Sequence, residues 1–129
     1  MNSAVGLHLL AELRVPPRLS ARLNDRSWLL GRLRECVARA GFLVVGEAVH
    51  AFEPQGITAC LLLAESHLTI HSWPETGVAA LDLYVCNHTR DNSECAREAF
   101  AWLCDQFDTP DVEVRSVPRG VARFEQATT

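Results

Sequence analysis

The sequence has no long apolar run and no cluster of like charges, and these absences narrow the classes of protein it can represent. No apolar stretch approaches the roughly 20 residues of a membrane span, and the first residues carry neither the basic nor the apolar segment of a secretory signal. The 12 basic residues are spread along a chain of net charge −4, so they form no patch for a nucleic acid or an anionic membrane. We therefore expect a cytoplasmic protein that acts on a small molecule, with no nucleic-acid partner and no membrane partner.

The cysteines show none of the spacings of a disulfide framework or a paired-cysteine metal site. There are five of them, an odd number, without a Cys-x-x-Cys pair, and most lie in apolar stretches where a reduced thiol packs as a small hydrophobic group. What the chain does have is 48% hydrophobic residues in a length of 129, which is enough for the core of one domain over residues 1–129.

Hydrophobic periodicity predicts two amphipathic helices and six strands. Apolar residues recur every three or four positions over 28–40, between a candidate cap at Asn24 or Asp25 and a stop at Gly41, and again over 91–107. Extended segments are predicted at 8–13, 42–50, 57–64, 67–72, 78–86 and 112–117.

The order of these elements is β-α-β-β-β-β-α-β, with a Pro16-Pro17 pair that interrupts the chain after the first strand. Four consecutive strands with hairpin-length connections predict a mainly antiparallel sheet, and the two helices are expected on one face of it. The predicted fold class is therefore α+β, a two-layer sandwich.

Polar residues interrupt two of the apolar strands, and they are the strongest functional signal. The residues are Glu65, Ser66, His67, His71 and Glu75. Polar groups in such a setting need partners or a role, and a hydroxyl near an imidazole is typical of an activated nucleophile. Strand alternation puts His67 and His71 on one face, with Ser66 at the edge, where a bend could turn it toward His71.

The next strand carries a second polar stripe on one face, made of Asp82, Tyr84 and Cys86. A cysteine at that place could donate a proton to a substrate. Taken alone, Cys86 fits inert packing better, and His8 and His50 are interpreted as ordinary packing residues.

The histidine spacing also leaves a metal site open as an alternative. His67 and His71 are four residues apart, and Cys86 and His88 could complete a zinc site with them. Residues four apart share a face on a helix, however, and the Leu-Thr-Ile between the two histidines favours a strand. We therefore expect no metal.

Three runs of this region resemble bacterial and archaeal S-adenosylmethionine decarboxylases. They are Phe52-Glu-Pro-Gln-Gly-Ile-Thr58, Ala64-Glu-Ser-His-Leu-Thr-Ile-His-Ser-Trp-Pro-Glu75 and Ala80-Leu-Asp-Leu-Tyr-Val-Cys86. The resemblance includes the spacings from about residue 50 to residue 86 and is weaker on either side.

The resemblance implies a proenzyme that cleaves itself between Glu65 and Ser66. In that family the serine hydroxyl attacks the preceding carbonyl, and the resulting ester is eliminated, with the histidine that matches His71 assisting removal of the α-proton. Hydrolysis then leaves a pyruvoyl group, derived from Ser66, as the covalent cofactor. Thr58 matches a serine that supports this processing and keeps the hydroxyl.

The two products would be a β chain, residues 1–65, and an α chain, residues 66–129. The pyruvoyl ketone forms a Schiff base with the substrate amine and takes up the electrons that decarboxylation releases. By resemblance, Cys86 is the proton donor, Phe52 stacks on the adenine of the substrate, and Glu75 binds the ribose hydroxyls.

The implied activity is a carboxy-lyase that converts S-adenosylmethionine into the aminopropyl donor of polyamine (spermidine) biosynthesis. The implied assembly is a homodimer of processed protomers that share residues at each site. Two alternatives stay open: the same machinery acting on ornithine or arginine, and an unprocessed, non-catalytic paralogue.

The chain departs from the family pattern beside the site. Asn87 stands where glycine is common, Val85 stands where threonine is common, and residues 12–17 lack a cysteine often found there. Because Asn tolerates positive φ, the turn after Cys86 can survive. These departures put the identity of the substrate in question more than the processing.

Overall fold

The computed structural model describes residues 5–87 and 90–120, and their elements follow the predicted order. The strands are β1 (Gly6–Arg14), β2 (Val44–Ala51), β3 (Ile57–Leu63), β4 (Ser66–Trp73), β5 (Val78–Cys86) and β6 (Val112–Arg119), and the helices are α1 (Arg26–Ala40) and α2 (Ser93–Asp105). A 3-10 helix, η1 (Pro17–Asn24), was not predicted. No helix in the described part of the chain is long and apolar enough to cross a membrane.

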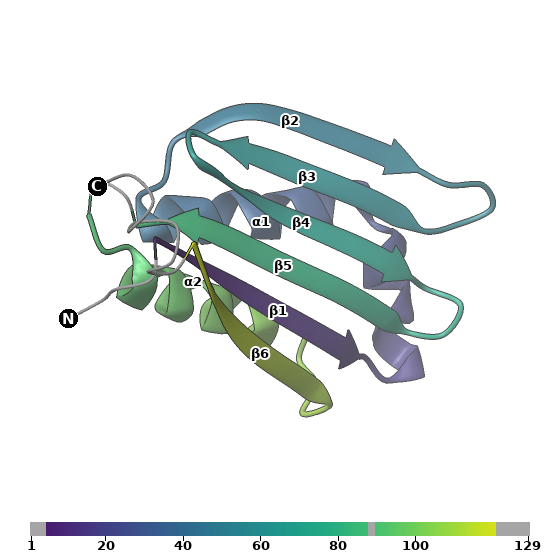
Figure 1. The fold of residues 1–129 in the computed structure, drawn as a ribbon. Helices are drawn as coiled ribbons and strands as arrows, with labels where there is room; N and C mark the ends of the chain where they lie inside the picture. The colour runs from purple at the N-terminus through teal and green to yellow at the C-terminus, as the bar shows by residue number, and fades with distance from the viewer. Residues whose placement is uncertain (1–4, 88–89, 121–129) are drawn as a thin grey trace.

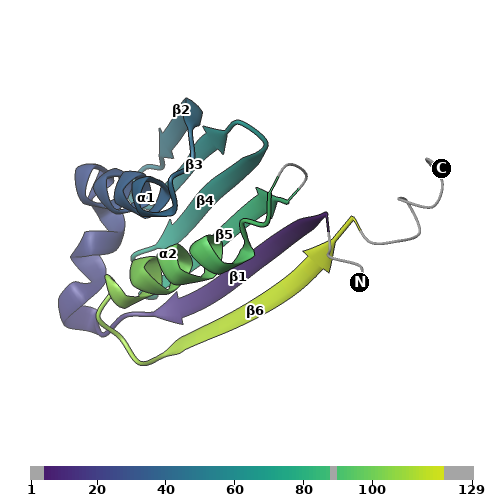
Figure 2. The same cartoon turned by 90° about the vertical axis from the view of Figure 1, so that its left-hand side faces the viewer.

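The strands form one six-stranded sheet in the order β2-β3-β4-β5-β1-β6, and every neighbouring pair is antiparallel. Both helices lie on the same face of this sheet, and the other face is open (Figures 1 and 2). The predicted α+β two-layer sandwich is confirmed.

Local signals explain where the first helices begin and end. Pro17 opens η1, a position where the N–H that proline lacks is not needed, and Leu19 and Leu23 point into the core. The side chain of Asp25 then accepts a hydrogen bond from the backbone N–H of Trp28 at 3.0 Å, which caps α1. Gly41 ends α1 with φ 77°, in the left-handed region that favours glycine.

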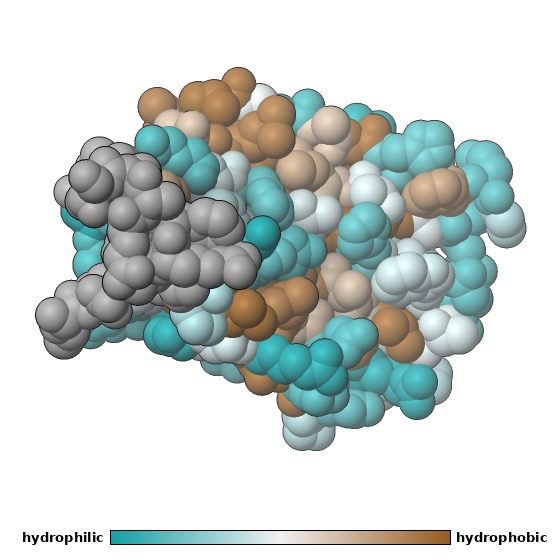
Figure 3. Space-filling model, viewed as in Figure 1, coloured by the Kyte–Doolittle hydropathy of each residue, from teal (hydrophilic) through white to brown (hydrophobic). Residues whose placement is uncertain are grey.

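Strand alternation separates a covered face of the sheet, which packs against the helices, from the open face. On β5 the covered-face residues are all buried: Ala79, Leu81, Leu83 and Val85. They pack with apolar residues of both helices, including Leu33 and Phe100, in one core. The open face carries a mixture of polar and apolar side chains (Figure 3).

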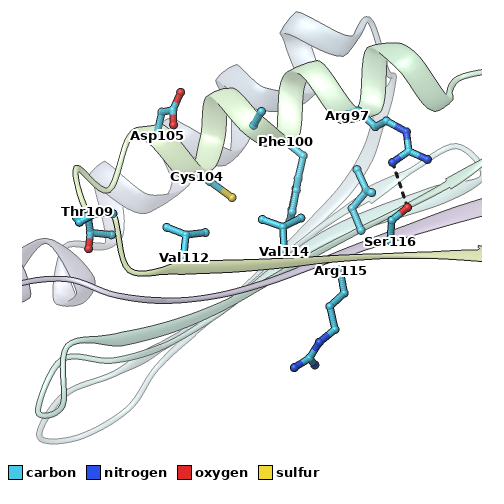
Figure 4. Close-up of a pocket in the computed structure, with 12 residues that line it drawn as sticks. Arg97, Phe100, Cys104, Asp105, Thr109, Val112, Val114, Arg115 and Ser116 are labelled. Atoms are coloured by element: carbon cyan, nitrogen blue, oxygen red, sulfur yellow. Dashed lines mark hydrogen bonds between the residues drawn. The ribbon is translucent and has the colours of Figure 1, made fainter.

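A hollow of about 480 Å³ lies between α2 and β6 on the covered side of the sheet (Figure 4). Its apolar lining includes Phe100, Cys104, Val112 and Val114, and Arg97 reaches across it to donate a hydrogen bond to the Ser116 hydroxyl at 3.1 Å. None of the predicted site residues lines it.

Candidate active site

The antiparallel topology divides the predicted site residues between two ends of the sheet. The β2–β3 loop and the β4–β5 turn lie at one end, and the β3–β4 turn and the last residue of β5 lie at the other (Figure 1). We call the first group the histidine end, which contains Phe52, Thr58, His71 and Glu75. We call the second group the serine end, which contains Glu65, Ser66 and Cys86.

At the serine end, the bond expected to break lies beside a tight turn. Leu63 of β3 pairs with Ser66 of β4, so only Ala64 and Glu65 connect the two strands. Glu65 is exposed and Ser66 is half-buried. Both line a hollow of about 210 Å³, and Cys86 lines the same hollow from the end of β5. The nucleophile and the proton donor expected from the sequence are therefore brought to one site.

The segment after Cys86 is held by side-chain hydrogen bonds. The Asn92 side chain donates to the Cys86 carbonyl at 2.8 Å, and the Asn87 side chain accepts from the Asn92 backbone N–H at 2.8 Å. Among the described residues only Asp108 combines a side chain with positive φ, so the chain leaves β5 without a left-handed residue at Asn87. Asn87 acts through its amide group instead.

Arg90 is a residue of the serine end that the sequence analysis missed. It lines the same hollow as Ser66 and Cys86, and its Nε donates to Oδ1 of Asn92 at 2.6 Å. Its position could have indicated this role, because Arg90 lies in the segment after Cys86 that departs from the family pattern. Substitutions beside a site often change what the site binds.

At the histidine end, Thr58 and His71 lie directly opposite each other on β3 and β4. The Thr58 hydroxyl and Nδ1 of His71 share a hydrogen bond of 3.0 Å, so Nε2 is the ring nitrogen left for proton transfer. This contact fixes the imidazole on the open face, where His71 is half-buried. Two residues to which the resemblance assigns roles in processing are therefore in contact.

Phe52 and Glu75 lie in the loops that border the histidine end. The Phe52 ring is 51% exposed and contacts the His50 ring edge-on, with 4.5 Å between centroids. Its loop is closed by the Phe52 backbone N–H, which donates to the Gly56 carbonyl at 2.8 Å. Glu75 is exposed in the β4–β5 turn. An aromatic ring and a carboxylate are thus free to contact a ligand at this end.

Ser66 and His71 of one chain lie far apart. Both belong to β4, which runs without a break from Ser66 to Trp73. Five residues of extended strand span about 16 Å, so the two side chains cannot meet, and the bend that could have turned Ser66 toward His71 is absent. One chain therefore holds two separate parts of the predicted machinery.

The alternative zinc set is not assembled in the described residues. His71 and Cys86 lie at opposite ends of the sheet, and His88 lies outside the described residues. His67 is bonded instead to Asp82, with 3.2 Å between Nε2 and Oδ1.

The fold defines the class of protein. It matches the crystal structure of the adenosylmethionine decarboxylase from Aquifex aeolicus with a TM-score of 0.82 and 27% identity, over 93% of this chain and 94% of that one. The sequence profile described as S-adenosylmethionine decarboxylase matches residues 7–120. The chain belongs to the S-adenosylmethionine decarboxylase family.

Curated relatives support this assignment over most of the chain. The S-adenosylmethionine decarboxylase proenzyme of Symbiobacterium thermophilum is 38% identical over 127 residues, which is 98% of this chain and 92% of the relative. The proenzyme of Synechococcus sp. strain WH7803 is 36% identical over 127 residues, covering 95% and 94%. That of Parasynechococcus marenigrum is 44% identical over 94 residues, 71% of each chain.

Proposed function

We propose that this chain is the proenzyme of a pyruvoyl-dependent S-adenosylmethionine decarboxylase that cleaves itself between Glu65 and Ser66. The observation that carries the proposal is the meeting of Ser66 and Cys86 in one hollow, beside an exposed two-residue turn, in a chain of this family. The product supplies the aminopropyl donor of spermidine synthesis, and the cleavage products are residues 1–65 and residues 66–129.

Self-cleavage needs only protein groups and one water molecule. The Ser66 hydroxyl attacks the Glu65 carbonyl carbon, the amide C–N bond breaks, and an ester and a free amine form. A base then removes the α-proton of Ser66, and elimination expels the Glu65 carboxylate. Hydrolysis of the remaining dehydroalanine releases ammonia and leaves the pyruvoyl group at residue 66. Nε2 of His71, with Nδ1 held by Thr58, is the base suited to the second step.

The serine end fits the covalent cofactor and the reaction. The hollow gives space beside Ser66, and Asn92 and Asn87 fix the backbone around Cys86. The pyruvoyl group supplies the electron sink that decarboxylation of an amino acid requires. Cys86, half-buried in the same hollow, returns a proton to the substrate carbon. Phe52 and Glu75 select an adenosyl group through its base and its ribose hydroxyls.

The separation of the two ends supports the proposed homodimer. Two protomers that stack their open faces in opposite directions would bring the histidine end of one to the serine end of the other. Apolar side chains support such packing, because Leu62 is 50% exposed on this face and Val117 is 44% exposed. Each site then takes its nucleophile from one protomer and its base from the other.

Intact-mass measurement of the purified chain tests the cleavage. We expect two chains that meet at Glu65 and Ser66, the second bearing a pyruvoyl group. Carbon dioxide release from S-adenosylmethionine, ornithine and arginine then identifies the substrate. A wild-type chain that stays whole would support an unprocessed paralogue and overturn the proposal.

Mixing two inactive variants tests the sharing of sites. Ser66→Ala and His71→Ala are each expected to stay uncleaved alone. In mixed dimers the His71→Ala chain should cleave, because its Ser66 meets the histidine of the Ser66→Ala chain. Cleavage of His71→Ala alone would remove His71 from the mechanism. Mixed dimers that form without cleavage would overturn the proposal that two protomers share each site.

A further inference from the structure

Two histidines and an aspartate converge on the open face, and the proposed reaction uses none of them. His8 of β1 and His67 of β4 lie on either side of β5, and both pair with Tyr84 in the sheet register. Nε2 of His8 is 3.1 Å from Oδ1 of Asp82, and Nε2 of His67 is 3.2 Å from the same oxygen. Because strands two apart in a sheet are separated by about 9.6 Å, both imidazoles lean over β5 toward one point.

We propose that this cluster binds a divalent transition-metal ion through Nε2 of His8, Nε2 of His67 and a carboxylate oxygen of Asp82. The three ligand atoms lie within 4.8 Å of one another. A tetrahedral ion with bonds of about 2.0–2.1 Å holds its ligands about 3.3 Å apart, close to the nitrogen–oxygen distances of 3.1 and 3.2 Å in the cluster. Binding therefore requires only small side-chain movements.

The ligand types indicate which ions the cluster accepts. Two imidazoles and one carboxylate suit Zn²⁺, Co²⁺, Ni²⁺ or Fe²⁺, whereas Ca²⁺ and Mg²⁺ prefer oxygen ligands alone. The side chains of His8, His67 and Asp82 are 19%, 36% and 26% exposed, so the site is sheltered but open to solvent on one side. Three protein ligands with an open position leave the fourth place for water or a small ligand.

A hollow of about 160 Å³ adjoins the cluster on the side of Asp82, which lines it together with residues of β1, β5 and β6, whereas His8 and His67 lie outside its lining. Tyr84 turns its phenol toward Gly6, where an added Cβ would lie 2.6 Å from the Tyr84 hydroxyl oxygen.

Arg119 competes with the ion. Its Nη1 lies 3.4 Å from Nδ1 of His8, and because arginine can only donate, this contact makes Nδ1 an acceptor and puts the His8 proton on Nε2. An ion on Nε2 needs that proton gone and leaves Nδ1 as the donor, so the guanidinium must turn away. Removing the guanidinium should therefore strengthen binding.

Titration of the metal-free protein with Co²⁺ and Zn²⁺ tests the proposal by visible absorption and calorimetry. We expect one ion per chain, with a cobalt spectrum free of thiolate charge transfer. His8→Gln, His67→Gln and Asp82→Asn should each weaken binding about 100-fold or more, since even the groups behind a ligand contribute about 10–100-fold. Arg119→Met should tighten binding several-fold.

Two controls separate this site from others. His50→Gln removes an imidazole from outside the cluster and should leave affinity unchanged. Titrating both the wild-type chain and the uncleaved Ser66→Ala chain shows whether cleavage next to His67 changes the affinity for the ion. Circular dichroism establishes that each variant is folded. The proposal is independent of the decarboxylase activity, because every readout is binding.

Three results would overturn the proposal. They are absence of saturable binding, equal affinity in folded His8→Gln and wild-type protein, and a thiolate-to-cobalt charge-transfer band, which would place the ion at a cysteine. Under any of them the cluster would be a hydrogen-bonded group in which two imidazoles share one carboxylate.

Discussion

The two faces of the sheet use the same strands for different purposes. On β4, Leu68 and Ile70 are fully buried against the helices, whereas His67, Thr69 and His71 are half-buried on the open face. Strand alternation alone produces this division. The covered face holds the fold together, and the open face is free to carry imidazoles, hydroxyls and carboxylates.

On the covered face, the buried polar side chain is hydrogen-bonded. Ser72 is the buried polar residue of this face in the described part of the chain, and its hydroxyl contacts backbone groups of Leu23 and Ile57. On the open face, water or a second protomer can satisfy polar groups. Substitutions at neighbouring residues of one strand should therefore have different effects: those on the covered face should lower stability, and those on the open face should lower activity.

The largest contrast is expected between His71 and Ile70. His71→Ala should abolish self-cleavage but cost about 1 kcal/mol of stability or less, because it removes one half-exposed hydrogen bond. Ile70→Ala empties a fully buried site and should cost about 2–5 kcal/mol, while the folded fraction still cleaves. Intact mass and denaturant unfolding measure the two effects. If His71→Ala is as unstable as Ile70→Ala, the two faces do not differ in their contribution to stability.

The architecture could be predicted because its signals are local. The predicted range 78–86 is the observed β5, and Asp25 and Gly41 bound α1 through the cap and the left-handed residue that their types favour. The sequence does not predict the 3-10 helix, because a Pro-Pro pair is typical of an interruption. Pro17 instead occupies a first helical position, where proline is favoured.

The spatial grouping of the site could not be predicted in the same way. The resemblance identifies Ser66 and His71, but only the unbroken run of β4 shows that they lie at opposite ends. His8 was interpreted as a packing residue. Its contact with Asp82 depends on β1 inserting beside β5, a pairing between distant segments that no local pattern reveals.

A smaller effect is expected at Ser72. Its hydroxyl donates to the Leu23 carbonyl at 2.6 Å and accepts from the Ile57 N–H at 3.0 Å. Ser72→Ala leaves both groups buried without this partner and should cost about 1–3 kcal/mol, without loss of cleavage. Ser20→Ala, which removes an exposed hydroxyl bonded to Pro17, should change stability by about 0.5 kcal/mol or less. If urea unfolding shows that both variants lose the same free energy of unfolding, burial does not determine the effect of removing a serine hydroxyl.

The smallest effect at neutral pH is expected for the thiol of Cys36. Burial against the covered face raises its pKa from 9.0 to about 12, so the folded protein keeps the proton that the unfolded chain loses. Stability should be unaffected below pH 9.0 and should fall as the pH rises toward about 12. The chain contains no lysine, but burial also raises the pKa of Cys104, to about 11, so this second core thiol contributes to the same decline.

Denaturant unfolding as a function of pH measures this effect. Cys36→Ala should make the alkaline decline shallower, with a constant offset for the lost side chain and with the contribution of Cys104 remaining. Cys60→Ala, which removes a half-exposed thiol from the open face, should keep the decline. If the free energy of unfolding falls equally steeply with pH in both variants, the buried thiol does not determine the loss of stability at alkaline pH. A shallower decline for Cys36→Ala alone would show that the two faces differ in proton binding as well as in packing.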